Sequence, residues 1–348
     1  MKVVLNQLEQ CAPSITVLMA VFNGARWLSD AIESVLHQTF KNFEFIIIND
    51  GSTDNSLEII ERYQEQDNRI IIICKPNTGL ADSLNQGIYK ARGEWIARLD
   101  ADDVCEANRL ERQLELAQTN SNIVFVGTGL TIINEMGRKL ATHQYPTMHI
   151  NLSNALLTCN KFPAHSSAFY NTKVVRELGG YRGRIKRAED WDLWLRLSAT
   201  GEFRSLTAPL IQLRHHSKQI SHDESGQRQL FDSRMAVVSY WIRQLGHADP
   251  IDANEVLFNS FVSWLRGRLV RDHFFEFHEH SILIRSHLYN MPGSLIDTLK
   301  VIFNLLKRPV FLSRFVKERI FGDRLLRQLA LEWVEQGKLN VRHRQNSL

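Results

Sequence analysis

The sequence predicts an α/β fold with a mostly parallel central sheet flanked by helices, followed by a helical C-terminal extension. Over residues 15–120, short and nearly continuous apolar runs alternate with segments of helical periodicity. Polar or acidic residues follow each apolar run, where a strand would end. Continuous apolar strands separated by helices are typical of a parallel sheet covered on both faces. The 348 residues, 44% of them hydrophobic, suffice for one large or two modest domains.

Four strands and three helices are expected in alternation in this region. The strands are Ile15–Val21, Phe43–Ile48, Ile70–Cys74 and Trp95–Leu99. Apolar side chains repeat at helical spacing from Trp27 to Leu36 and from Leu57 to Tyr63, and a third helix covers Leu80–Ile88. Ser52 or Asp54 can cap the second helix.

The pattern changes after the fourth strand. Strands and loops mix over residues 123–213, with a helix expected at residues 187–200, and the chain reads as mostly helical beyond Ser221. We therefore expect a lead-in at residues 1–13, a sheet domain at residues 14–221 and a mostly helical region at residues 222–348.

Cysteine usage and hydropathy exclude several classes of protein. The four cysteines are far apart and form no Cys-x-x-Cys pair, which argues against a zinc site or a disulfide framework and fits a reducing cytosol. No stretch approaches the roughly 18 apolar residues that cross a bilayer. Asn6 and Gln7 interrupt the N-terminal apolar run, so it does not resemble a secretory signal. A cytoplasmic protein is expected.

Three carboxylates, Asp100, Asp102 and Asp103, follow the fourth strand within four residues. Clustered carboxylates repel one another and are costly to dehydrate unless a cation is present. A hard divalent ion such as Mg²⁺ or Mn²⁺, with a diphosphate on its far side, would supply that neutralisation. The alternative is a solvated Asp-rich turn.

The other expected strand ends also carry polar side chains. Asn23 follows the first strand, Asp50 the second and Asn77 the third. Ligands of parallel α/β sheets bind at the carboxyl ends of the strands, so we expect these residues and the acidic cluster to share one rim. A helix cap or a turn would explain any one of them, but it must be invoked at four strand ends.

Six segments carry a family resemblance. They are Val17–Asn23, Ile48–Asp54, Asn77–Leu80, Asp100–Asp103, Glu189–Trp194 and Arg214–His216. In this order and spacing they resemble the family 2 glycosyltransferases, inverting enzymes with the GT-A fold, over residues 14–221. The resemblance implies a Rossmann-like GT-A domain with a nucleotide-binding half at residues 14–120 and an acceptor half at residues 121–221.

The resemblance also implies how the donor nucleotide is bound. Ala20, Phe22 and Asn23 would line the nucleotide pocket, with the Phe22 ring beside the base. Asp50 would accept a hydrogen bond from the imide N3–H of uracil, a role that suits a group that only accepts. Family members more often have Tyr and a preceding Pro in the first segment, and Asp in place of Asn49.

Further roles follow for the rest of the donor site. Asn77 and Asp82 would lie beside the nucleotide, Asp100 would face the sugar and ribose, Asp102 would hold an Mn²⁺ or Mg²⁺ ion that bridges the diphosphate, and Arg214 and His216 would approach the diphosphate or its metal. Such an ion offsets the charge on the departing nucleoside diphosphate. For His216 a purely structural role is the alternative.

The resemblance places the general base at Glu189–Asp190. An inverting transfer needs one base to deprotonate the acceptor hydroxyl as it attacks the anomeric carbon. We assign that role to Asp190, with Glu189 and His165 as acceptor contacts. The alternative is that both acids only complement the dipole at the start of a helix.

The net charge of +4 is concentrated near the C-terminus, where residues 291–348 carry 11 basic and 5 acidic side chains. Between residues 295 and 319, apolar side chains recur at helical spacing beside Lys and Arg. Such amphipathic basic segments suit an anionic membrane surface, and an ordinary helical subdomain is the alternative. Nucleic acid is not expected, because aromatic and basic side chains are not interleaved.

The sequence thus predicts an inverting transferase that moves a sugar from a nucleotide donor, UDP-linked, to a saccharide or undecaprenyl-diphosphate-linked acceptor in cell-surface polysaccharide or lipopolysaccharide assembly. The protein would be cytoplasmic and peripheral on the inner face of the membrane. One alternative is a sugar-1-phosphate nucleotidyltransferase, although residues 23–26 are poor in the glycines that its phosphate loop needs. A catalytically inactive saccharide-binding scaffold is the other.

Overall fold

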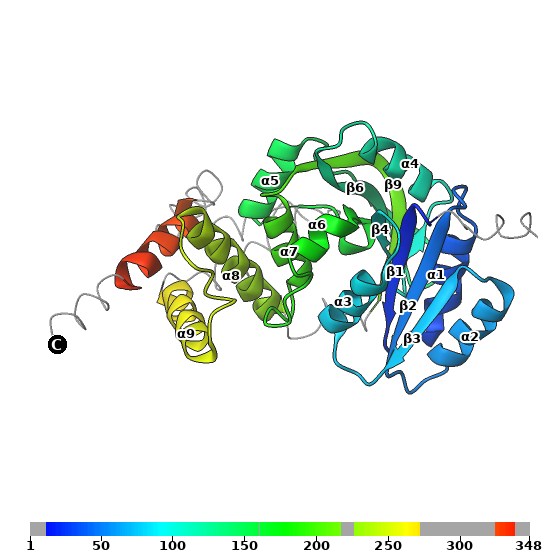
Figure 1. Ribbon diagram of the computed structural model, residues 1–348, viewed down its shortest axis with the longest axis horizontal. Helices are drawn as coiled ribbons and strands as arrows, with labels where there is room; N and C mark the ends of the chain where they lie inside the picture. Colours follow the sequence, from blue (N-terminus) through cyan, green and yellow to red (C-terminus); the bar gives the residue numbers. More distant parts are fainter. Residues whose placement is uncertain (1–11, 160, 217–225, 272–323, 338–348) are drawn as a thin grey trace, which may run out of the picture. The chain divides into compact units, whose positions relative to one another are not determined.

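The structure is a computed structural model that describes residues 12–159, 161–216, 226–271 and 324–337 (Figure 1). The chain divides into two compact units, residues 1–225 and residues 226–348. The first unit holds the sheet and all the candidate site residues named above.

The predicted parallel strands are present and lie side by side. They are β1 (Ile15–Val21), β2 (Phe43–Asp50), β3 (Ile70–Lys75) and β4 (Trp95–Arg98), in the spatial order β3-β2-β1-β4. The pairs β1–β2, β1–β4 and β2–β3 are all parallel, as the continuous apolar runs predict. Nearly every side chain of β1 and β2 is buried. The carboxyl ends of the four strands therefore meet at one edge of the sheet.

Helices cover both faces of this parallel half. The helices α1 (Ala25–Leu36) and α2 (Ser56–Gln66) pack in one core with the β1 side chains of Val17 and Met19. On the other face, α3 (Leu80–Lys90) approaches β1 so closely that a Cβ at Gly87 would lie 2.1 Å from a methyl of Leu18. The glycine is needed for this close approach.

The second half of the unit extends the same sheet with strands of mixed direction. Its strands are β5 (Val104–Cys105), β6 (Ile123–Asn134), β7 (Lys139–His143), β8 (Phe169–Asn171) and β9 (Glu202–His215), and the described strands follow the order β3-β2-β1-β4-β8-β6-β9-β5, with β7 on β6. Its helices are α4 (Arg109–Ala117), α5 (His149–Leu157), the short 3-10 helix η1 (His165–Ser167), α6 (Thr172–Glu177) and α7 (Glu189–Leu197). The expected helix at residues 187–200 is thus observed as α7.

The long strand β9 carries the chain back to the acidic turn. It runs parallel to β6 as far as Asn134, which lies opposite His215. It also pairs with β5, where Val104 lies opposite Gln212. Because β5 begins directly after Asp103, this pairing places the residues at the end of β9 beside the acidic turn.

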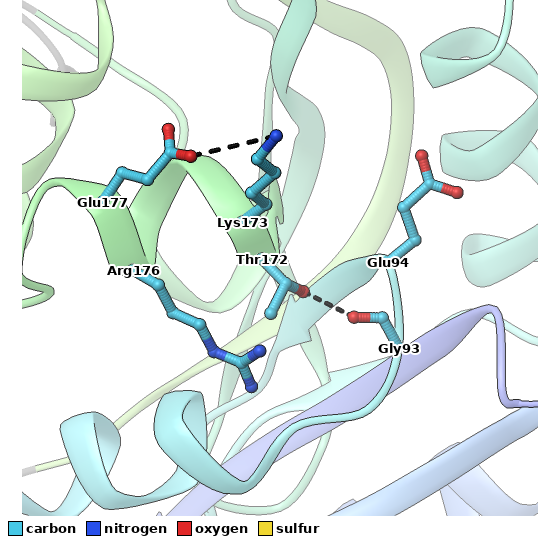
Figure 2. Close-up of a pocket in the computed structure, with 6 residues that line it drawn as sticks. All are labelled: Gly93, Glu94, Thr172, Lys173, Arg176 and Glu177. Carbon is cyan, nitrogen blue, oxygen red and sulfur yellow. Dashed lines mark hydrogen bonds and ion pairs between the residues drawn. The ribbon is translucent and has the colours of Figure 1, made fainter.

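A shallow depression lies at the end of β4 that is opposite the acidic turn, and its residues connect β4, α6 and the end of α3. Its lining residues are Gly93, Glu94, Thr172, Lys173, Arg176 and Glu177 (Figure 2). The Thr172 hydroxyl donates to the Gly93 carbonyl at 2.7 Å, and Arg176 donates to the carbonyls of Ile88, Tyr89 and Ala91 at the end of α3. Arginine at a helix C-terminus satisfies carbonyls that lack a helical partner.

The second unit consists of helices in its described part. These are α8 (Gly226–Gln244), α9 (Glu255–Arg271) and a helix over residues 324–337. The rings of Phe261 and Trp264 lie 5.1 and 5.2 Å from that of Trp333, and Arg268 pairs with Glu332 at 2.9 Å. None of the helices in the described ranges has the length and apolarity that a membrane crossing requires. The amphipathic segments expected between residues 295 and 319 lie outside the described residues.

Candidate active site

Three carboxylates converge on the turn that follows β4. Asp100, Asp102 and Asp103 each offer one oxygen, and these oxygens lie within 4.8 Å of one another. The side chains of Asp100 and Asp102 are 37% and 30% exposed, whereas Asp103 is buried. The group therefore opens toward solvent on one side and is held by the protein on the other.

Arg98 and Ser166 hold the buried side of this acidic turn. The guanidinium of Arg98, only 2% exposed, pairs with the Asp100 carboxylate and donates to the Ser166 hydroxyl oxygen at 3.0 Å. The Ser166 hydroxyl lies 2.8 Å from Asp100 Oδ2 and also bonds to Asp103. Ser166 belongs to η1, so a segment more than 60 residues away in the sequence shapes the turn.

The cluster is short of positive charge. Burial, and next the neighbouring carboxylates, raise the pKa of Asp102 above its usual value and that of Asp103 well above it. Burial also opposes the ionisation of Asp100, but the ion pair with Arg98 outweighs it and lowers the pKa. A bound cation would reverse the first two shifts.

His216 joins the cluster from the end of β9. Its Nε2 lies 2.8 Å from Asp102 Oδ2, and its ring lies 4.3 Å from that of Trp27, centroid to centroid. His216 is buried, as is Trp27 in the first turn of α1. The clustered carboxylate oxygens are ligands suited to Mn²⁺ or Mg²⁺, and the His216 nitrogen lies beside one of them, that of Asp102. These residues therefore fit the divalent ion that the sequence implied.

Arg214 braces the turn from the inside. Its backbone N–H donates to Asp103 Oδ1 at 2.8 Å. Its guanidinium donates to the carbonyls of Asp102 at 2.9 Å and Glu135 at 3.2 Å, and to Asp30 at 3.1 Å. The described contacts of Arg214 thus fix the acidic turn, and its expected contact with a diphosphate stays a prediction.

Asp50 organises the loop that follows β3. Its two carboxylate oxygens accept from the backbone N–H groups of Thr78 and Gly79, each at 3.0 Å, and Lys75 forms an ion pair with it. Burial opposes the ionisation of Asp50, but these donors outweigh it and lower the pKa. Asp82, at the start of α3 and half exposed, shares Lys75 at 3.2 Å.

The loop after β1 ties the rim together. Asn23 adopts a left-handed backbone (φ 53°), and its side-chain oxygen accepts from the Thr53 backbone N–H at 2.8 Å. A Cβ on the next residue, Gly24, would lie 3.5 Å from Ala101 in the acidic turn. This loop therefore touches both the segment after β2 and the turn after β4. The other expected nucleotide contacts, Ala20, Phe22 and Asn77, range from half-buried to exposed, with Phe22 53% exposed.

Glu189 and Asp190 form the first turn of α7. Burial, and next the adjacent Asp190, raise the pKa of Glu189 to about 8. Burial also raises the pKa of Asp190, while the field of Arg98 lowers it and that of Asp100 raises it. The acids therefore lie within electrostatic reach of the acidic turn.

His165 lies on the same side of the site. Its Nε2 is 2.7 Å from the Tyr181 hydroxyl, and its ring packs 5.9 Å from that of the buried Trp194. Burial, and next the charge of Arg98, push its pKa well below the usual value, so it is neutral at pH 7. A neutral imidazole can contact a sugar hydroxyl without adding charge.

Sequence reasoning missed several residues that hold the site. They are Trp27, Lys75, Arg98, Ser166 and Tyr181. Trp27 was read only as an apolar position of a helix, and Arg98 only as part of a strand. A charged residue in an otherwise apolar strand, two positions before a carboxylate, was the available signal for Arg98.

The sequence matches the model described as Glycosyl transferase family 2 over residues 16–179. It is also similar to the O-antigen biosynthesis glycosyltransferase WbnJ of Escherichia coli, with 34% identity over 208 residues that cover 59% of this chain and 80% of that protein. The chain belongs to glycosyltransferase family 2. Membership confirms the transferase class that the sequence motifs predict.

Solved structures of other proteins share the fold of this family 2 glycosyltransferase. TarS of S. aureus, in complex with UDP-GlcNAc, aligns with a TM-score of 0.55 at 15% identity, covering 74% of this chain and 72% of that chain. The mannosyltransferase PcManGT of Pyrobaculum calidifontis, in complex with GDP-Man and Mn²⁺, aligns with a TM-score of 0.50 at 14% identity, covering 93% and 88%. At these identities the likeness shows the fold alone, and it agrees with the predicted GT-A architecture.

Proposed function

We propose that this glycosyltransferase is a metal-dependent inverting enzyme that moves a sugar from a UDP-sugar to a saccharide acceptor. The observation that carries the proposal is the contact between His216 and Asp102, which belongs to the acidic cluster. Another member of this cluster, Asp100, is close enough to Asp190 to raise its pKa. Such a transfer needs residues that bind a divalent cation and a carboxylate that acts as the base.

On the donor side, Asp102 and His216 would hold the divalent ion, with Asp100 and Asp103 completing the negative charge around it. The ion supplies charge compensation for the diphosphate leaving group. Arg98 holds Asp100 in place, so this carboxylate can accept hydrogen bonds from sugar or ribose hydroxyls. Asp50, with Phe22 and Asn23 nearby on the rim, would receive the uracil base.

On the acceptor side, Asp190 would take the proton of the acceptor hydroxyl. The hydroxyl oxygen then forms a bond to the anomeric carbon, while the bond from that carbon to the diphosphate oxygen breaks and UDP leaves from the opposite face. Burial raises the pKa of Asp190, which makes its carboxylate a stronger base than an exposed aspartate. Glu189 and His165 would contact the acceptor.

A role in surface polysaccharide or lipopolysaccharide assembly has support from the relative WbnJ, which is named for O-antigen biosynthesis. The acceptor would then be a saccharide or an undecaprenyl-diphosphate-linked sugar at the inner face of the cytoplasmic membrane. The basic segment at residues 291–348 supports peripheral binding to anionic lipid.

The test is a donor screen that measures UDP release from nucleotide sugars with Mn²⁺, with and without membranes that carry undecaprenyl-diphosphate sugars. Acceptor-dependent UDP release supports the proposal. Release of pyrophosphate instead would favour a nucleotidyltransferase, and donor binding without turnover on a broad acceptor panel would favour an inactive scaffold.

A further inference from the structure

The indole ring of Trp27 contacts several residues beside the candidate metal site. Trp27 is 9% exposed, and its ring centroid lies 4.3 Å from that of His216, with 36° between the planes. The guanidinium carbon of Arg214 lies 5.6 Å from the same indole ring. Trp27 thus touches both residues that β9 brings to the acidic turn, from 187 or more positions away in the sequence.

A second contact fixes the indole itself. Its Nε1–H donates to the carbonyl oxygen of Glu135 at 3.3 Å, in the turn between β6 and β7. The same oxygen accepts from Arg214 at 3.2 Å, and the Glu135 carboxylate pairs with Arg26 at 2.9 Å. The side chains of Trp27, Arg214 and Arg26 therefore all bind this turn. The indole cannot rotate without losing its hydrogen bond to Glu135.

The backbone that carries Trp27 is also rigidly placed. The next residues on the inner face of α1, Leu28, Ala31 and Ile32, are completely buried in the sheet core. A side chain on such a helix is a more exact support than one on a loop. By contrast, His216 lies just past the end of β9, so its ring orientation depends on what packs against it.

We propose that Trp27 is a positioning residue that holds the His216 imidazole with Nε2 toward Asp102, and so preorganises the cation side of the site. Trp27 touches neither the ion nor the donor in this scheme. The inference rests on the proposed function, because it takes His216 and Asp102 as metal ligands. Residues that orient a metal-binding histidine commonly change metal affinity 10–100-fold when they are replaced.

The experiment measures Mn²⁺ binding by electron paramagnetic resonance in the presence of UDP, without acceptor or turnover. Trp27→Leu removes the ring and is expected to weaken Mn²⁺ binding about tenfold. Trp27→Phe keeps an aromatic face and is expected to stay within about threefold of the wild type. Trp27→Met serves in place of Trp27→Leu if the latter does not fold.

A double-mutant cycle separates positioning from general packing. In a His216→Ala background, Trp27→Leu should weaken Mn²⁺ binding no further, because the imidazole that it orients is gone. The matched control is Trp95→Leu, which removes a buried indole stacked 5.1 Å from Phe169 and should lower stability without changing Mn²⁺ affinity.

The outcomes distinguish the two claims. Wild-type Mn²⁺ affinity in Trp27→Leu, or an equal loss in the presence and absence of His216, would overturn the positioning role and leave the metal site standing. A wild-type protein that binds no Mn²⁺ with UDP would overturn the metal site and this inference together.

Discussion

Asp102 Oδ2 lies 2.8 Å from His216 Nε2, although the two residues are 114 positions apart in the chain. The pairing of β5 with β9 produces this contact, because β5 continues from the acidic turn and β9 ends one residue before His216. Because β9 also runs along β6, the contact forms only when both halves of the sheet are correctly paired. The candidate metal site is therefore a product of the whole first unit.

Removing the carboxylate of Asp102 should weaken metal binding without unfolding the protein. Asp102→Ala leaves His216 without its partner and lowers the charge that attracts a divalent ion, so Mn²⁺ binding should fall at least tenfold and UDP binding should fall with it. Stability should not drop, since one of several repelling carboxylates is gone.

Titration calorimetry with Mn²⁺ and UDP checks this expectation. Asp67→Ala is the matched control: Asp67 precedes β3, at the opposite end of the sheet, and pairs only locally with Arg69 among the described residues. It should leave both affinities unchanged. Unaltered Mn²⁺ binding by Asp102→Ala would remove this residue from the metal site.

Replacing the proposed base should stop the chemistry and spare binding. Asp190→Asn keeps the shape of the side chain but cannot take a proton, so transfer should slow by about 10²–10⁴-fold. The affinity for UDP, measured by calorimetry, should stay within about twofold, because the base acts on the acceptor hydroxyl. Near-normal turnover by Asp190→Asn would show that another group is the base.

Glu189 should make the protein less stable as the pH rises. Its pKa is about 8 in the folded protein against 4.5 for an ordinary glutamate, so the folded state binds more protons between these values. Stability therefore falls as the pH rises from about 4.5 to 8. Glu189→Gln removes the ionisation, and we expect a higher melting temperature at pH 8, by ~2–4 °C for each kcal/mol recovered.

Melting curves of the wild type and Glu189→Gln at pH 5 and pH 8 test the sign of this effect. The two proteins should differ little at pH 5, where Glu189 is protonated, and most at pH 8. A larger difference at pH 5 would contradict the burial of this carboxyl group.

Arg98 is the buried cation that stabilises the acidic turn. Arg98→Met leaves Asp100 without its ion pair; breaking a fully buried pair costs about 3 kcal/mol, and we expect a smaller cost here because Asp100 is 37% exposed. Without the charge of Arg98, the acidic turn is more negative and should bind a cation more tightly. Mn²⁺ should therefore raise the melting temperature of Arg98→Met more than that of the wild type. Equal Mn²⁺ effects on the two proteins would mean that Arg98 does not compensate the cluster.

The sequence predicted those parts of the fold that local patterns determine. Strands β1 to β4 are continuous apolar runs, and a polar residue at each strand end lies on the rim, as Asp50 and Asp102 do. The pairing of β9 with β6 and β5 was not predictable, because it joins segments about 80 to 110 residues apart and no local pattern encodes that register.

Contacts between side chains that are far apart in the sequence were equally unpredictable. The contact of Arg214 with a diphosphate stays a prediction, but its contacts with Asp102, Glu135 and Asp30 could not be read from the sequence. The charge of an arginine is visible in a sequence, but the direction of its guanidinium depends on the tertiary fold. The same holds for Ser166, whose hydroxyl binds a turn far away in the chain.

Asp50 should be more important to the rim than its exposed neighbour Asp82. The carboxylate of Asp50 accepts from two backbone N–H groups and from Lys75, whereas an asparagine would present an NH₂ group to at least one of these donors. Asp50→Asn should therefore lower the free energy of unfolding by about 1–3 kcal/mol and weaken UDP binding. Asp82→Asn, at a half-exposed side chain, should change stability by under about 1 kcal/mol. Urea unfolding and UDP titration of both variants decide the matter, and equal stability of the two would refute the structural role given to Asp50.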